Sequence, residues 1–227
     1  MNQFTEEKII QSWHKNAHPW VSAIRNNEIE SRRMVTNAAI IQTIHSLNVN
    51  SVLDIGCGEG WLTRSLNRFG ISTTGFDIVD ELLAAAKKEG EGTYVKLAYE
   101  DFHNYAFHKT FDLAVCNFSL LGDKSVSSVF KSVPGCLEPG GKFVIQTIHP
   151  EVDSVMKNKA SGWREGSWSG FSETFTDPAP WYFRTKNDWQ QLFTENSFFL
   201  EKIIEPKHPQ TNLPLSIIFV ATPKKLD

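Results

Sequence analysis

Three glycines that alternate with other residues follow an acidic residue in the segment Asp54-Ile-Gly-Cys-Gly-Glu-Gly60. Residues 51–55, just before the glycines, predict a short buried strand, and residues 61–69 predict a helix with one apolar face. Glycine lets the backbone approach a ligand closely, and the first turn of a helix has N–H groups without partners. We therefore expect a ligand-binding loop at this junction.

The spacing of the glycines separates two classes of ligand. A dinucleotide loop follows the order GxGxxG, whose last glycine would stand at position 61, and this chain has Trp61 there. A pyrophosphate does not favour the carboxylate of Asp54 beside it, whereas a ligand with a positive ammonium or sulfonium group does. The amino-acid end of S-adenosylmethionine carries such groups, so we expect this cofactor in preference to NAD.

A second acidic residue, Asp77, ends the next predicted strand. Its carboxylate can accept hydrogen bonds from both hydroxyls of a ribose, as in doubly wound folds generally. This role fits NAD as well as S-adenosylmethionine, so the glycine spacing and the C-terminal strand pattern distinguish the two cofactors.

The rest of the chain predicts the elements that position these residues. Besides 51–55, we expect strands over 71–76, 93–98, 111–117, 142–148, 198–204 and 215–221. Besides 61–69, we expect helices over 5–16, 31–47, 81–88, 126–133 and 188–195, with a turn at 138–141. We also expect the His18-Pro19 pair to interrupt the first helix.

This alternation predicts an α/β fold with a Rossmann-like, doubly wound, seven-stranded sheet and helices on both faces. Only a loop, residues 205–213, separates the last two strands, which leaves no room for a crossover helix. The sheet should therefore be mostly parallel, with an antiparallel C-terminal hairpin strand.

The length of 227 residues suits a single domain, 1–227. We expect residues 1–48 or so to form an N-terminal helical cap. Residues 150–183 show no clear periodicity and contain Trp163, Trp168 and Trp181, so we expect a lid insertion there.

Composition and charge exclude several other classes. A formal net charge of -3 with interspersed signs lacks the basic footprint of a nucleic-acid binder, so we expect no nucleic-acid partner. The three widely spaced cysteines suggest neither a metal nor a redox pair, and we expect no metal. We also expect no membrane partner and a cytoplasmic protein, because we find neither a signal-peptide pattern nor a long apolar stretch. The oligomeric state stays open.

Four segments resemble motifs of the class I S-adenosylmethionine-dependent methyltransferases: VLDIGCGEG, GFDIVD, FDLAVCNFSLLG and LEPGGKFVIQTIHP. The resemblance covers most of the chain. The acidic residue that this family often has after the third strand is replaced by Ala98.

Carried over by motif, the resemblance implies cofactor contacts along the glycine loop and at the ends of the next three strands. The expected cofactor residues are Asp54, Gly56, Cys57, Gly58, Asp77, Ile78, Tyr99, Glu100, Asn117 and Phe118. The glycine loop would contact the methionine part, and Asp77 and Ile78 would hold the ribose and the adenine face. Tyr99 and Glu100 would line the adenine pocket, with Asn117 and Phe118 beside the sulfonium.

The expected function is transfer of a methyl group to an oxygen or nitrogen atom of a small-molecule acceptor. The segment after the fourth strand lacks the Asn-Pro-Pro-aromatic motif of enzymes that methylate the amino groups of adenine or glutamine. The stretch WYFRTKNDWQQ resembles the late region of small-molecule methyltransferases, which makes Trp181, Tyr182 and Arg184 candidate substrate residues. Packing of the lid explains these aromatic residues equally well. The alternatives are a protein or tRNA methyltransferase and a non-catalytic S-adenosylmethionine-binding protein.

Two further residues have candidate roles. His149 directly follows the fifth strand, at the edge where open α/β sheets bind ligands, and is the candidate general base. A structural role at the strand end is its alternative. For Arg32 we expect a surface salt bridge, with pairing to the cofactor carboxylate as the alternative.

Overall fold

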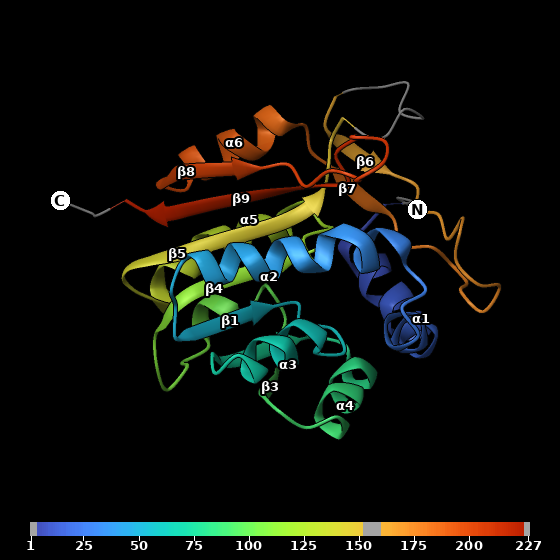
Figure 1. Ribbon diagram of the computed structural model, residues 1–227, viewed down its shortest axis with the longest axis horizontal. Coiled ribbons are helices and arrows are strands. Elements are labelled where there is room, and N and C mark those ends of the chain that lie inside the picture. The colour runs from blue at the N-terminus through green and yellow to red at the C-terminus, as the bar shows by residue number, and fades with distance from the viewer. Residues whose placement is uncertain (1–3, 152–159, 225–227) are drawn as a thin grey trace.

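The computed structural model describes residues 4–151 and 160–224. Its central sheet has seven strands (Figure 1). They are β1 (Ser51–Ile55), β2 (Ser72–Asp77), β3 (Thr93–Lys96), β4 (Phe111–Asn117), β5 (Leu137–Ile148), β8 (Phe198–Ile204) and β9 (Ser216–Pro223). Their order in space is β3-β2-β1-β4-β5-β9-β8.

Strands β1 to β5 pair in parallel, and β9 runs antiparallel to both of its neighbours, β5 and β8. The fold class expected from the sequence is therefore confirmed, including the antiparallel C-terminal strand. From β1 the chain builds the sheet outward through β2 and β3, and it then returns to the other side of β1 with β4. The crevice for a ligand lies at such a reversal, beyond the carboxyl ends of the strands.

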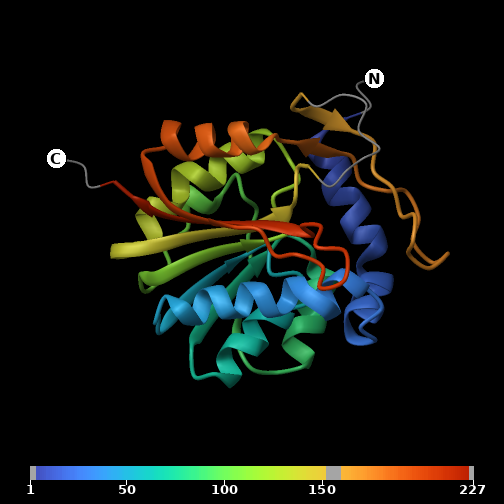
Figure 2. The same cartoon turned by 45° about the horizontal axis from the view of Figure 1, so that its top comes forward.

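Helices cover both faces of the sheet (Figure 2). They are α1 (Glu6–Arg25), α2 (Asn37–Ser46), α3 (Trp61–Arg68), α4 (Asp80–Lys88), α5 (Lys124–Ser132) and α6 (Lys186–Glu195). Leu53 of β1 packs in one cluster with Phe130 of α5 and Phe193 of α6. Its neighbour Val52 packs in a second cluster with Leu62 of α3, because successive side chains of a strand point to opposite faces.

The first helix differs from the prediction. Pro19 lies inside α1, so the His18-Pro19 pair does not end the helix. The apolar face continues past the proline, where Ala17 and Trp20 pack with Leu82 of α4, and this packing outweighs the local cost of the proline. The predicted helix 31–47 also begins differently, because Arg32–Thr36 form a π-helical turn before α2.

Two other segments are more regular than predicted. Residues 138–141, expected as a turn, belong to β5, where a register shift separates the pairs Phe111–Leu137 and Leu113–Lys142. In the lid segment, β6 (Gly162–Arg164) and β7 (Trp181–Phe183) form a small antiparallel hairpin. Residues 152–159 of that segment lie outside the described residues. None of the helices in the described residues is long and apolar enough to cross a membrane.

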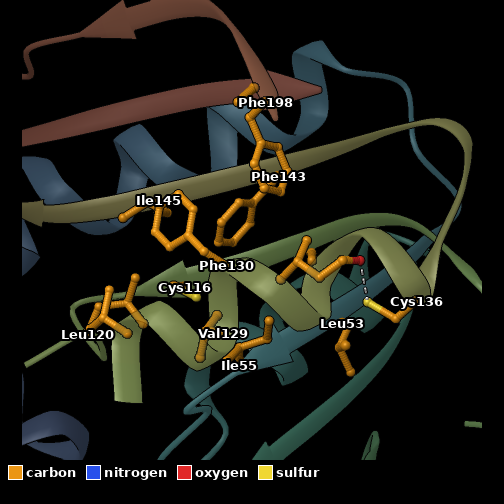
Figure 3. Packing of buried hydrophobic residues seen from close by; sticks show 14 of the residues in the cluster. Leu53, Ile55, Cys116, Leu120, Val129, Phe130, Cys136, Phe143, Ile145 and Phe198 are labelled. Atoms are coloured by element: carbon orange, nitrogen blue, oxygen red, sulfur yellow. Dashed lines mark hydrogen bonds between the residues drawn. The ribbon is translucent and has the colours of Figure 1, made fainter. Parts of the chain in front are cut away.

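A group of aromatic rings fills the core between the sheet and the pair α5 and α6. Phe130 of α5 points toward Phe143 of β5 and Phe198 of β8 (Figure 3), with ring centroids 5.2 Å and 5.8 Å away. Phe193 of α6 closes the group at 4.9 Å from Phe130, and all four rings are at most 2% exposed. Such close, edge-on contacts make this cluster the main connection between α5 and the sheet.

Replacing Phe130 by alanine should therefore lower the free energy of unfolding by about 3–5 kcal/mol, because a cavity remains in a core that cannot fully collapse. Urea denaturation followed by circular dichroism measures the loss. Phe199→Ala is the matched control, since Phe199 on β8 is 62% exposed and should shift the same quantity by no more than about 0.5 kcal/mol. Similar losses in the two variants would contradict the assignment of the core.

Candidate active site

A pocket of about 1010 Å³, including open space at its mouth, lies beyond the carboxyl ends of β1 to β4. Most of the expected cofactor residues line it: Gly56, Cys57, Gly58, Asp77, Ile78, Tyr99, Glu100, Asn117 and Phe118. They come from the ends of four different strands, which the parallel pairing brings to one edge of the sheet.

The glycine loop has the left-handed backbone that its sequence suggests. Gly56, Gly58 and Gly60 have φ angles of +70°, +57° and +80°. A Cβ atom at Gly56 would collide with the hydroxyl of Tyr99 and lie 2.5 Å from Cβ of Ser119, whereas one at Gly58 would meet nothing within 4 Å. Gly56 thus allows close packing beneath the loop, and Gly58 leaves space on the side of the pocket.

Asp54 lies behind this loop and is not part of the pocket lining. Its side chain is buried and accepts a hydrogen bond from the hydroxyl of Thr63 at 2.9 Å. Burial raises the pKa of Asp54 to about 7, the Thr63 hydrogen bond opposes this shift, and the nearby charge of Asp77 adds to it. The carboxyl group therefore holds Thr63 of α3 against the end of β1, behind the pocket.

Asp77 does reach the pocket. One carboxylate oxygen accepts from the backbone N–H of Gly58 and the other from that of Val79, both at 2.9 Å. Burial raises the pKa of Asp77, and these two backbone hydrogen bonds oppose the shift. The hydrogen bonds fix the orientation of the carboxylate, so it is placed before any ligand arrives.

Arg32 does not form the expected surface salt bridge. The residue is 9% exposed, and its guanidinium lies 4.7 Å from the ring centre of Trp61 and 5.8 Å from that of Trp20. Burial lowers the pKa of Arg32 to about 10, and the charge of Glu59 opposes this shift. The π-helical turn and the packing of α1 direct the side chain inward, where Nη2 has no hydrogen-bond partner among the described residues.

Glu59 is a pocket residue that the sequence reasoning missed. It is 1% exposed, and its Oε2 lies 2.6 Å from Arg64 Nη2 and 3.9 Å from Arg25 Nε. Its Oε1 has no hydrogen-bond partner among the residues that the structure describes. The pocket lining beside the glycine loop therefore offers one unpartnered donor, on Arg32, and one unpartnered acceptor, on Glu59.

Helix α1 forms the opposite wall, at the mouth of the pocket. Ile9, Trp13 and Trp20 line the pocket from this helix. The Trp13 ring lies 6.0 Å from that of Trp168 in the lid segment. Hydrogen bonds link the same segments, because the Asn16 side chain donates to the carbonyl of Thr176 at 2.7 Å and accepts from its N–H at 2.9 Å.

A smaller hollow of about 510 Å³ adjoins the first one, and Phe118 and Leu121 line both. The candidate substrate residues Trp181, Tyr182 and Arg184 lie around this hollow, together with His149.

Arg184 is already engaged by the chain itself. Its guanidinium donates to the carbonyl of Gly122 at 2.7 Å and to the carbonyl and carboxylate of Asp123 at 3.2 Å and 3.1 Å. Burial lowers its pKa, and the charge of Asp123 opposes the shift. The guanidinium also lies over the rings of Tyr182 and Trp189. Its polar atoms hold the β4–α5 connection.

His149 is 1% exposed at the end of β5. Its Nδ1 accepts from the N–H of Glu151 at 3.2 Å, which assigns the proton of the neutral ring to Nε2. Nε2 lies 3.4 Å from Oε1 of Glu205, whose carboxylate also binds Lys186 at 2.6 Å. The described residues contain no group of three or more His, Cys, Asp or Glu that could hold a metal ion.

Residues 52–141 match the family model of the methyltransferase domain. Over this range the chain is similar to methyltransferase domains. The chain is 32% identical over 122 residues to a ubiquinone biosynthesis O-methyltransferase of Shewanella pealeana, covering 52% of each protein. It is 31% identical over 121 residues to that of Vibrio cholerae, covering 52% of this chain and 49% of the relative. The chain spans about half the length of the curated relatives it matches.

The fold of this methyltransferase domain and its flanking segments also has solved counterparts. An S-adenosylmethionine-dependent methyltransferase from Clostridium acetobutylicum has a TM-score of 0.65 at 16% identity, over 94% of this chain and 99% of that one. The glycopeptide N-methyltransferase MtfA, solved with S-adenosylmethionine, has a TM-score of 0.60 at 18% identity, over 81% and 86% of the two chains. The expected family and fold are confirmed, whereas the role of each site residue stays a prediction.

Several lining residues of the methyltransferase domain and its α1 wall were not expected from the sequence: Glu6, Ile9, Ile10, Glu59, Trp61, Ser119 and Ser125. The helical spacing of Ile9, Ile10 and Trp13 could have indicated a covering face. Glu59 could have been noticed as an acid between two loop glycines. No comparable pattern marks Ser119 or Ser125.

The raised pKa of Asp54 predicts a pH dependence of stability. The unfolded chain loses this proton near pH 4 and the folded chain near pH 7, so the stability that the proton supplies is lost as the pH rises between these values. The free energy of unfolding of the wild-type protein minus that of Asp54→Asn should therefore be about 2–3 kcal/mol larger at pH 5 than at pH 8. Urea denaturation of both proteins at the two pH values measures this, and parallel pH curves would contradict it.

Proposed function

We propose that this chain is an S-adenosylmethionine-dependent methyltransferase that acts on an oxygen or nitrogen atom of a small-molecule acceptor. The observation that carries the proposal is the arrangement around the glycine loop. The oriented carboxylate of Asp77 lines the pocket, and the unpartnered atoms of Arg32 and Glu59 lie beside the loop.

The residues present fit this cofactor. The buried Nη2 of Arg32 would gain a partner in the carboxylate of the methionine part, and Oε1 of Glu59 would gain one in its ammonium group. Asp77 would accept from the ribose hydroxyls, with Ile78 against the adenine and Glu100 at its edge. A buried polar atom without a hydrogen-bond partner is costly, so a zwitterionic ligand that supplies a partner to both atoms is favoured. The pyrophosphate of a dinucleotide would meet the negative charge of Glu59 instead.

The bound cofactor would supply an electrophilic methyl group on a sulfonium. The chain's own contribution is largely positioning, because displacement at an activated carbon needs alignment and exclusion of water. Asn117 ends β4 at the first hollow, and Phe118, the next residue, lines both hollows, where the acceptor atom and the methyl group would meet.

A small acceptor suits the second hollow, whose lining includes the aromatic rings of Phe118, Trp181 and Tyr182. Two of the matched relatives are named ubiquinone biosynthesis O-methyltransferases, over about half of their length. We therefore infer a planar hydroxyl compound such as a phenol as the first acceptor to test. A protein or tRNA acceptor would need a wide and basic mouth, whereas α1 and the lid segment narrow this one.

We further infer that residues 1–227 act as one domain, with an N-terminal cap over about 1–48 and a lid over 150–183. The contacts of Trp13 with Trp168 and of Asn16 with Thr176 support a joint cap. All three cysteines are buried and unpaired, which supports a reducing, cytoplasmic environment.

Calorimetric titration with S-adenosylmethionine, its demethylated product S-adenosylhomocysteine and NADH tests the ligand. The first two should bind and NADH should not. Asp77→Ala should weaken binding by roughly 1–3 kcal/mol, about 5- to 150-fold, because a charged acceptor for two hydroxyls is lost. Asp80→Ala is the matched control, since its carboxylate is exposed and pairs with Lys96. NADH binding at comparable affinity, or full affinity in Asp77→Ala, would overturn the assignment.

His149→Gln tests the candidate base with a phenol acceptor. As a base, the His149 ring would accept the proton at Nδ1, and its hydrogen bond from the Glu151 N–H would have to break first. Glu205, beside Nε2, would stabilise the cation that results. Turnover should fall about 10²- to 10⁴-fold while the affinity for S-adenosylhomocysteine stays within about threefold. The control His108→Ala, at an exposed histidine, should leave both quantities unchanged. Unchanged turnover in His149→Gln would leave positioning as the sole contribution of the chain.

A panel of phenols, amines, a peptide and tRNA distinguishes the alternatives. Methyl transfer to a small phenol or amine supports the proposed function. Transfer to the peptide or to tRNA alone would instead support a protein or tRNA methyltransferase. Cofactor binding without transfer to any of these would favour a non-catalytic binding protein.

A further inference from the structure

A carboxylate from the first turn of α1 occupies the N-terminus of α5. Oε1 of Glu6 accepts from the backbone N–H groups of Asp123 at 2.8 Å, Lys124 at 2.9 Å and Ser125 at 3.4 Å. Oε2 accepts from the hydroxyl of Ser125 at 2.6 Å. These are the donors that a helix leaves without partners at its start, and a negative charge there is favoured by the helix dipole.

The cap of α5 comes from a distant part of the chain. Asp123 stands at the N-cap position, but its own side chain makes no capping hydrogen bond. The adjoining Gly122 leaves room for Glu6, since a Cβ atom there would collide with Oε2. Glu6 and the Gly122–Ser125 segment, more than a hundred positions apart in sequence, therefore fit one another in both shape and hydrogen bonding. A chance surface contact would not need both.

The other end of α1 is attached to a different helix. Ala17 and Trp20 pack with Leu82 of α4, and Nη2 of Arg25 donates to the carbonyl of Ala85 in α4 at 3.3 Å. Helix α1 therefore runs past the carboxyl edge of the sheet, with its second half on α4 and its first turn on α5 (Figure 2). Ile9 and Trp13, between these attachments, face the pocket.

The lid segment is attached at the same place as Glu6. The N–H of Tyr182 donates to the carbonyl of Leu121 at 2.8 Å, and Arg184 binds the carbonyls of Gly122 and Asp123. Leu121 lines both hollows. Both covering segments therefore meet the domain on residues 121–125, which border the acceptor side of the pocket.

We propose that Glu6 is the latch that holds α1 closed, and that ligands leave when its carboxylate releases the N-terminus of α5. Because the second half of α1 stays on α4, the wall opens from the acceptor side. Glu6 acts through α1 as a positioning residue and takes no part in the chemistry. The identity of the released ligand rests on the proposed function, whereas the latch is a property of the chain alone.

Hydrogen exchange in the unliganded protein tests the latch without any cofactor. In Glu6→Ala, amides in the first turns of α1 and α5 should exchange about tenfold faster, the fold-change expected for loss of a charged helix cap of ordinary strength. Those in the second half of α1 should keep the wild-type rate. The milder Glu6→Gln retains one acceptor oxygen and should give a smaller change in the same segments.

Glu7→Ala is the matched control. Glu7 is the next residue of the same turn, is exposed and accepts a hydrogen bond from Gln11 within α1. In Glu7→Ala, the amides of α5 should exchange at the wild-type rate. If Glu6→Ala fails to fold, Glu6→Gln and Ser125→Ala, which lacks the hydroxyl donor, test the same contact.

Release of S-adenosylhomocysteine, followed by stopped-flow tryptophan fluorescence, connects the latch to the pocket. Glu6→Ala should release it about tenfold faster than wild type, and Glu7→Ala at the wild-type rate. A wild-type protein that binds neither S-adenosylmethionine nor its product would refute the proposed function, while the exchange data still decide the latch. Normal binding with unchanged exchange and release in both Glu6 variants would overturn the latch.

Discussion

Parallel pairing of β1 with β2 on one side and β4 on the other is the constraint on which the site depends. It brings the glycine loop after β1, Asp77 at the end of β2 and Asn117 at the end of β4 to one edge of the sheet. The loop must then turn sharply over the strand ends, and the N–H groups of Gly56 and Cys57 both reach the carbonyl of Phe76 in β2. The loop is thereby tied to the neighbouring strand.

Burial of charge at that edge follows from the same packing. Burial disfavours the ionised forms of Asp54 and Asp77, and Glu59 is paired with Arg64 behind the pocket. A buried charge with an incomplete set of partners lowers stability, and titratable groups with perturbed pKa values cluster at functional sites. The domain thus gives up folding stability to keep a site of defined polarity.

The sequence could predict what depends on local pattern. The glycine loop, Asp77 and the approximate positions of the strands follow from residue order, and the ends of parallel strands meet at one edge of the sheet. The roles of Arg32 and Glu59 depend on tertiary packing: the π-helical turn and the α1 tryptophans bury a guanidinium that sequence alone would place in solvent. The course of α1 through Pro19 depends in the same way on its apolar contacts with α4, which no local propensity contains.

Pro19 has a mechanical consequence for α1. Proline has no N–H, so the carbonyl of Lys15, one turn earlier, lacks the usual intrahelical donor at that point. The missing bond lies between the first turn, which carries Glu6, and the second half, which packs on α4. A helix bends most readily where its ladder of hydrogen bonds is interrupted. The proline thus marks the place where α1 is least stiff, between the turn that carries Glu6 and the final turns that pack on α4.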